Sequence, residues 1–138
     1  MIVTKRLHLQ STGNTDIIDI TGEVQRALAD SGLTSGTATA FVAHSTAGIT
    51  TIECETGLLA DFKEAWERIV PKSIPYRHDG NLTEGNGYSH VRASILGPSL
   101  AIPFASRKLA LGTWQQIVLV DFDTRPRSRT VILQLAGE

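Results

Sequence analysis

The order of the predicted elements along the 138-residue chain limits its fold more than any other feature. Segments with strand character lie near both ends of the chain, whereas the strongest helical pattern lies in the middle. This order differs from the regular strand–helix alternation of parallel α/β proteins. It predicts an α+β fold: one compact, layered, sandwich-like α/β domain over residues 1–138, with a mixed or antiparallel sheet.

The clearest helical pattern runs from Gly57 to Val70. Its apolar residues recur with the 3.6-residue period of an amphipathic helix, and Pro71 ends it. A second helix is expected over residues 22–31 with Thr21 as its N-cap, and a third over 89–97. The predicted strands are residues 2–10, 16–21, 37–43, 99–104, 116–122 and 129–135, and residues 44–53 are expected to be extended or turning. The predicted apolar face of the main helix comprises Leu58, Leu59, Phe62, Ala65, Trp66 and Ile69.

Composition excludes several classes of protein. A net charge of −1 and a pI near 6.4 argue against a general nucleic-acid or membrane-surface binder, which would be basic. No segment approaches the roughly 20 apolar residues of a membrane span. The single cysteine, Cys54, excludes an intramolecular disulfide, and we expect it to be a small buried hydrophobic residue. We therefore expect a cytoplasmic protein without nucleic-acid or membrane partners.

Three histidines are candidate metal ligands. His44 directly follows the predicted strand over residues 37–43, while His78 and His90 lie at the ends of a glycine-rich stretch without apolar periodicity. Long structureless loops in compact domains are usually functional or disordered, and this one would bring its histidines toward His44. Three histidines with an open position make a catalytic type of metal site. Their spacing matches no local zinc motif, so the alternative is that they are ordinary surface or loop residues; His8 is expected to have no functional role.

Hydroxyl and carboxyl groups lie close to His44 in the sequence. Ser45 and Thr46 could hold a phosphate, and Gly48 permits unusual backbone angles or the close approach of a ligand. The alternative is an ordinary turn of small residues. Glu53 is a candidate general base or a hydrogen-bond partner of a histidine; the alternative is that acidic residues before the main helix complement its dipole.

Arginines recur at every second position in the segment TRPRSR. If this segment is extended, Arg125, Arg127 and Arg129 leave the chain on one face, where a phosphate or pyrophosphate would suit their paired donors. The alternative is that they pair with Asp121, Asp123 or the acidic residues of a neighbouring subunit.

Several motifs together resemble one known family. HSTAGITTIE, EGNGYSHVRASILGPSLAIPF and LALGTWQQIVLVDFD, followed by RPR and a further arginine, occur in this order between about Val3 and Leu135. They resemble the YjbQ-like family of uncharacterised proteins, often labelled secondary thiamine-phosphate synthase enzymes. The resemblance implies a homotrimer with a site near the subunit boundaries. It also implies joining of a pyrimidine-methyl diphosphate to a thiazole phosphate, with release of pyrophosphate, as a side activity.

The resemblance also implies roles for individual residues. The matching histidines would gather around a divalent metal, and the other matching residues would complete a pocket for a phosphorylated or anionic small molecule. Three histidines suit zinc or another transition metal, whereas Mg²⁺, the alternative, prefers oxygen ligands. The implied metal ligands are His44, His78 and His90; the implied phosphate-binding residues are Ser45, Thr46, Asn86, Gln115, Arg127 and Arg129; and the candidate catalytic residues are Glu53, Ser45 and Thr46.

Two functions from different classes follow. The first is a metal-dependent enzyme acting on a phosphorylated small molecule, either as a thiamine-phosphate synthase-like transferase or through phosphate-ester or diphosphate chemistry. The alternative is a non-catalytic trimeric protein that binds a metal, an anion or a metabolite. A third reading assigns the histidines and arginines to contacts between subunits only.

Overall fold

The structure, a computed structural model, describes residues 1–80 and 85–138. Its strands form two sheets in which every described pairing is antiparallel. In spatial order the first sheet contains β1 (Ile2–Ser11), β8 (Arg127–Gly137), β3 (Gly36–Val42), β5 (Ser99–Ala105) and β6 (Lys108–Leu109). The second sheet contains β2 (Asp16–Asp19), β7 (Gln116–Asp121) and β4 (Ala47–Ile52). The predicted α+β class is confirmed, with antiparallel pairing.

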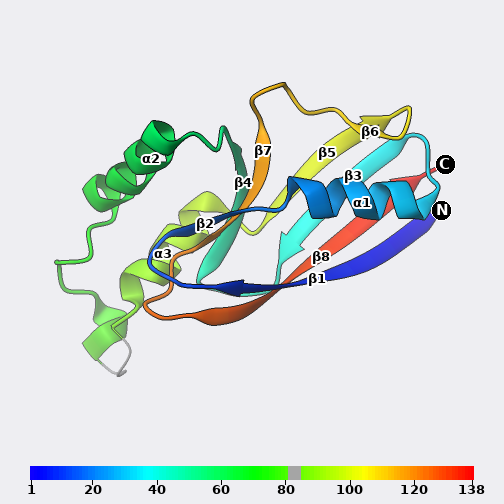
Figure 1. The fold of residues 1–138 in the computed structure, drawn as a ribbon. Helices are drawn as coiled ribbons and strands as arrows, with labels where there is room; N and C mark the ends of the chain where they lie inside the picture. The colour runs from blue at the N-terminus through cyan, green and yellow to red at the C-terminus, as the bar shows by residue number, and fades with distance from the viewer. Residues whose placement is uncertain (81–84) are drawn as a thin grey trace.

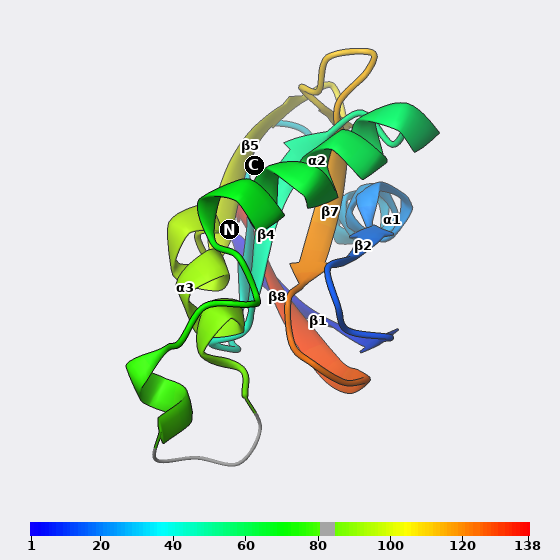
Figure 2. The same cartoon turned by 90° about the vertical axis from the view of Figure 1, so that its left-hand side faces the viewer.

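The helices lie on both sides of the second sheet. Figure 1 shows the first helix running beside the long strands of the first sheet, and Figure 2 shows the second and third on the far side of β4 and β7. In the described part of the chain no helix is long and apolar enough to cross a membrane. The helices are α1 (Thr21–Ser31), α2 (Thr56–Ile69), the 3₁₀ turn η1 (Arg77–Gly80) and α3 (Gly87–Leu96).

Strand β7 is buried on both faces and is the middle layer of the molecule. Its odd-numbered residues, Ile117 and Leu119, pack against α1 and the first sheet. Its even-numbered residues, Val118 and Val120, pack against α2 and α3. A strand covered on both sides needs apolar residues at successive positions, which explains the uninterrupted run IVLV.

The same alternation places polar groups at one end of the core between the sheets. Leu133 and Val131 of β8 face the second sheet, and two residues earlier the same face carries Arg129. Asp121 is two residues after Leu119 on β7 and therefore lies on the same face of the strand. The apolar core between the sheets therefore ends in a layer of buried charged side chains.

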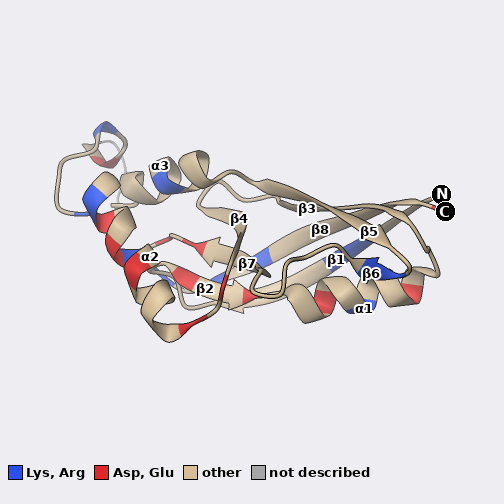
Figure 3. Cartoon of the chain, turned by 90° about the horizontal axis from the view of Figure 1, so that it is seen from above, with Lys and Arg blue, Asp and Glu red and all other residues tan. Residues whose placement is uncertain are grey.

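Helix α2 is attached mainly by one aromatic residue. Of its predicted apolar face only Trp66 is buried, with Phe62 and Phe122 edge-on to its ring, and Ile69 is exposed. Charged residues follow the helix along its length (Figure 3). At its C-terminus the buried Arg92 of α3 donates to the Val70 carbonyl from Nε at 3.0 Å and Nη2 at 2.8 Å. This guanidinium satisfies a carbonyl that the helix leaves without an internal partner.

Three local expectations were wrong or incomplete. Cys54 is exposed and not buried, because it lies in the link between β4 and α2, beyond the last strand pair. Thr21 is not the N-cap of α1; the helix begins after Ile20, and the Thr21 hydroxyl accepts a hydrogen bond from Ile117 N–H. The segment 44–53 contains β4, whose small residues and glycine gave too little alternation to predict a strand.

Candidate functional site

A hollow of about 440 Å³ opens where the buried charges reach the surface, beyond the end of β3 and the start of β8. We call it the arginine hollow. Its lining is mostly polar. It comes from the residues that follow β3, from Asp123 after β7, and from the first residues of β8. The lining residues are Ala43, His44, Ser45, Thr46, Asp123, Arg127, Ser128 and Arg129.

Arg129 and Asp121 form the buried base of this hollow. The guanidinium donates to the carboxylate from Nε at 2.6 Å and from Nη2 at 2.7 Å, and both side chains are almost fully buried. Ser11 also donates to this carboxylate, and Nη2 of Arg129 donates to Thr46 Oγ1 at 2.6 Å. A buried ion pair needs this degree of additional hydrogen bonding, because desolvation otherwise outweighs its attraction.

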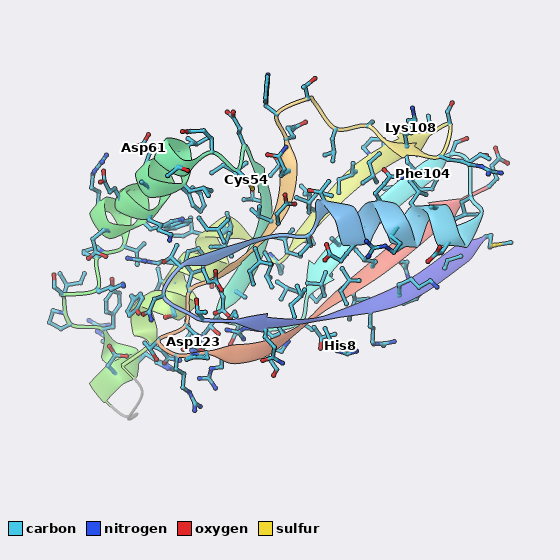
Figure 4. All side chains as sticks on the ribbon, viewed as in Figure 1. His8, Cys54, Asp61, Phe104, Lys108 and Asp123 are labelled. Atoms are coloured by element: carbon cyan, nitrogen blue, oxygen red, sulfur yellow. The ribbon has the colours of Figure 1, made fainter. Side chains whose placement is uncertain are left out.

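A second carboxylate, Asp123, which Figure 4 labels, joins the same network. It accepts hydrogen bonds from Thr46 Oγ1 at 3.0 Å and from Asn86 Nδ2 at 3.3 Å. Arg127 pairs with it through Nε at 2.9 Å. The alternative interpretation of the arginines, pairing with Asp121 and Asp123, is therefore correct for Arg127 and Arg129, and both of them line the hollow as well.

The network holds both carboxylates in their charged form. Burial raises the pKa of Asp121, but hydrogen bonds from Arg129 and Ser11 outweigh it and leave the pKa below its ordinary value. Burial also raises the pKa of Asp123, and hydrogen bonds from Thr124 N–H and Thr46 reverse the shift. The four charged groups of the network thus carry no net charge at neutral pH.

A second hollow, of about 240 Å³, adjoins the first at His44 and Ser45. We call it the histidine hollow. Helix α3 forms one of its walls, and Gly48 lets that wall approach, since a Cβ on this residue would lie 2.8 Å from Leu96 Cδ2. The close approach permitted by Gly48 is thus that of the α3 C-terminus. The lining residues are His44, Ser45, Ala47, His90, Ala93, Ser94 and Pro98.

His78 and His90 lie together, as the stretch between them was expected to allow. Their ring centroids are 4.6 Å apart and the rings are tilted by 53°. His44 shares the histidine hollow with His90. Among the residues that the structure describes, no three His, Cys, Asp or Glu side chains are grouped so as to hold a metal ion. The structure brings two of the three predicted histidines together, and the metal site stays a prediction.

His44 is already hydrogen-bonded through one ring nitrogen. Its Nε2 accepts from the backbone N–H of Thr130 at 3.0 Å. Burial and then the positive charge of Arg129 lower the pKa of His44, while Asp121 opposes this shift. His44 is therefore a neutral imidazole at neutral pH.

Two predicted site residues lie at the other end of β4 and β7. Glu53 follows the last residue of β4, and Gln115 precedes the first residue of β7. Gln115 accepts from Gly112 N–H at 2.8 Å and donates to Thr51 Oγ1 at 3.3 Å. A six-residue strand separates these residues from Thr46, which corresponds to roughly 20 Å. Neither of them lines the two hollows.

The remaining predicted residues differ in how they are engaged. Thr46 both donates to Asp123 and accepts from Arg129, so its hydroxyl is committed to the network. Ser45 is exposed, lines both hollows and has no side-chain hydrogen bond to any described residue. Sequence reasoning missed Ser11 and Ser128; the shared parity of Ser11 with Leu7 and Leu9 on β1 was the signal for the first.

The fold and the site define an antiparallel α+β protein with a polar hollow at the end of its inter-sheet core. The family model described as "UPF0047 protein YjbQ-like" matches residues 5–138. A UPF0047 protein of Archaeoglobus fulgidus is 38% identical, covering 93% of this chain and 97% of its own. Another, from Methanothermobacter thermautotrophicus, is 36% identical and covers 99% and 94%. The chain belongs to the YjbQ-like family, UPF0047.

Solved structures agree with this assignment. A YbjQ-like protein of unknown function from Sulfolobus solfataricus P2 superposes with a TM-score of 0.94 at 31% identity, over 100% of this chain and 99% of that one. A hypothetical protein from Aeropyrum pernix K1 gives 0.91 at 31% identity, over 99% of each chain. Their descriptions name no activity, so function rests on the chemistry of the site.

Proposed function

We propose that this protein is a metal-dependent enzyme that binds a phosphorylated small molecule in the arginine hollow. One observation carries the proposal: two arginines, an imidazole and an unengaged serine hydroxyl converge on a single hollow of about 440 Å³. Guanidinium groups bind phosphate oxygens through paired N–H donors.

The carboxylates that pair with the arginines support this role, although one of them, Asp123, lines the hollow itself. Asp121 binds Arg129 through Nε and Nη2, and among the described residues no partner engages Nη1. Because Asp121 already holds the Arg129 guanidinium in place, this group loses little conformational freedom when a ligand binds. The four network charges cancel, so the ligand is selected by the positions of the donors more than by a strong positive field.

The metal belongs to the His78–His90 pair in this proposal. Two imidazoles favour zinc or another transition metal over Mg²⁺, and oxygens of the bound ligand or water would complete its coordination. Such an ion would supply positive charge to a departing phosphate or pyrophosphate, or would activate a water. Thiamine-phosphate synthase activity enters as a side reaction of this kind, with pyrophosphate leaving from the arginine hollow.

We further propose assembly as a homotrimer with the site at a subunit boundary. Val91 and Ile95 are one turn apart on α3 and are 40% and 57% exposed, directly beside the wall of the histidine hollow. Burying such apolar side chains against a second copy would be favourable. We propose that this second copy contributes its Glu53 and Gln115, which are remote within one chain, to the hollow.

Calorimetric titration with pyrophosphate and with inorganic phosphate tests the binding site. Arg127→Gln should weaken binding at least tenfold, since it removes a charged donor from the lining. The matched control is Arg26→Gln, which removes one positive charge from an exposed position on α1. Equal weakening in both variants would indicate non-specific attraction, and unchanged binding in Arg127→Gln would refute the site.

Metal content and complementation test the enzyme. The protein purified without chelator should carry about one transition-metal ion per chain, and His78→Ala should lose it. Less than about a tenth of an equivalent in the parent would remove the metal from the proposal. Rescue of cells that lack their main thiamine-phosphate synthase should disappear in His90→Ala; rescue that survives would separate that activity from the histidines.

One observation favours the alternative, a non-catalytic trimeric protein that binds a metal, an anion or a metabolite. The hydroxyl of Thr46 is committed to the network, and Glu53 lies at the far end of β4, so neither can act as nucleophile or base within one chain. Tight binding of pyrophosphate without turnover of any phosphorylated compound would support this function.

A further inference from the structure

We infer that His44 donates a hydrogen bond from Nδ1 to the ligand in the arginine hollow and is not a ligand of the metal. The identity of the ligand rests on the proposed function; the state of the imidazole does not. The inference separates His44 from His78 and His90, with which the sequence resemblance groups it.

The position of His44 follows from where β3 ends. Strand β3 pairs with β8 as far as Val42 and Val131, so Thr130 lies one residue beyond the last pair. On its other side Thr130 is paired with His8 of β1. A backbone N–H at this point needs an acceptor, and Nε2 of His44 supplies it at 3.0 Å. The imidazole thus accepts the hydrogen bond that the backbone of β3 would accept if the strand continued.

This hydrogen bond fixes the tautomer. A backbone N–H only donates, so Nε2 must present its lone pair, and a neutral imidazole then carries its proton on Nδ1. No described residue bonds to Nδ1, and His44 is half-buried beside the two hollows. His44 lines both hollows, and its Nδ1 is left with a proton to donate.

The same tautomer does not suit a metal. Coordination through Nδ1 would require the proton on Nε2, where it would oppose the N–H of Thr130. Coordination through Nε2 would break the bond to Thr130 and leave that N–H without its acceptor. The bond on one imidazole nitrogen thus decides what the other nitrogen can bind.

Two substitutions distinguish a ligand-binding role from a structural one. The side-chain amide of His44→Asn occupies the place of Nδ1 and can donate there, whereas that of His44→Gln reaches the place of Nε2 and can accept from Thr130. We expect His44→Asn to bind pyrophosphate within about threefold of the parent and His44→Gln to bind at least tenfold more weakly. If His44 only accepted the hydrogen bond of Thr130, His44→Gln would bind pyrophosphate more tightly than His44→Asn. Tighter binding by His44→Gln, or equal losses of affinity in both variants, would overturn the inference.

Two-bond ¹H–¹⁵N spectra of the full chain at pH 7.5 measure the tautomer directly. His44 is assigned by the signals that vanish in His44→Gln. Protonation at Nδ1 is expected, and protonation at Nε2 would overturn the inference even if pyrophosphate binds. If no pyrophosphate binds to the parent, the proposed function fails, and this spectrum still decides the state of His44.

Zinc titration supplies the third readout. His44→Gln should retain zinc affinity within about twofold, while His90→Gln should lose at least tenfold. An equal loss of zinc affinity in the two variants would indicate that His44 is a metal ligand and would overturn the inference.

Discussion

The two ends of the β4–β7 strand pair carry polar side chains in opposite conditions. At one end Thr46, Asp121 and Asp123 are buried. Thr46 donates directly to Asp123, and Arg129 donates to both Thr46 and Asp121. At the other end Gln115 is exposed, and Cys54 bonds through its backbone to the Gln116 side chain. Figure 4 shows the labelled Asp123 and Cys54 at these opposite ends.

The two ends differ because one is buried and the other is exposed to water. Buried polar groups are costly unless every partner is present, so the first end has a single arrangement and fixes its donors in advance. The exposed end has water as an alternative partner, and its side chains can be replaced at little cost. Residues at the first end should therefore affect stability and binding together. Residues at the other end should have little effect on stability, and should affect binding only through the second copy proposed above.

The largest effect is expected for Asp121→Ala. It leaves the Arg129 guanidinium buried without its carboxylate, which costs about 3–5 kcal/mol in the free energy of unfolding. Denaturant unfolding measures it. The control at the exposed end is Gln116→Ala, which removes the acceptor of Cys54 N–H and should cost less than about 1 kcal/mol. Similar losses of unfolding free energy in the two variants would contradict the difference in stability proposed for the two ends of the strand pair.

Acid should destabilise the protein through the same carboxylates. Asp121 and Asp123 have a folded pKa below the ordinary 3.8, so the unfolded chain binds more protons in the interval between the two values. Their stabilising contribution is complete above about pH 4 to 5 and is lost as the pH falls through the folded pKa. The effect is smaller than deletion of Asp121, because a protonated carboxyl group keeps part of its hydrogen bonding.

Unfolding free energies between pH 2.5 and 7 measure this dependence. Asp121→Asn should show a shallower decline below pH 4, since it removes one of the two buried carboxylates of the network whose pKa is lowered. An identical decline in the variant would mean that other carboxylates cause the acid sensitivity.

Thr46→Val should cost about 1–3 kcal/mol, less than loss of a charge. Valine has the shape of threonine but removes the acceptor of Arg129 Nη2 and one donor to Asp123. Thr51→Val is the matched control on β4, because its hydroxyl only accepts from the exposed Gln115. A stability loss in Thr51→Val as large as in Thr46→Val would contradict the comparison.

How far the sequence predicts the molecule depends on the range of the interaction. Local periodicity predicted α2, and the small apolar run over residues 37–43 predicted β3, because each signal lies within a few residues. The pairing of Arg129 with Asp121 was one of two open alternatives, since sequence alone does not say which strands face each other across the core. Arg92 gave no signal: its burial depends on the end of α2 meeting α3. The exposure of Cys54 likewise follows from where β4 stops.

The smallest effect on stability is expected for Gln115→Ala, within about 0.5 kcal/mol, because its partners are exposed and water replaces it. Its effect on binding is the informative one. If a second copy brings Gln115 to the arginine hollow, pyrophosphate affinity should fall several-fold, and the fall should vanish at dilutions where light scattering shows monomers. Unchanged affinity in the assembled protein would show that Gln115 does not belong to the site. The exposed end of β4 and β7 would then have no reason to be placed at a subunit boundary.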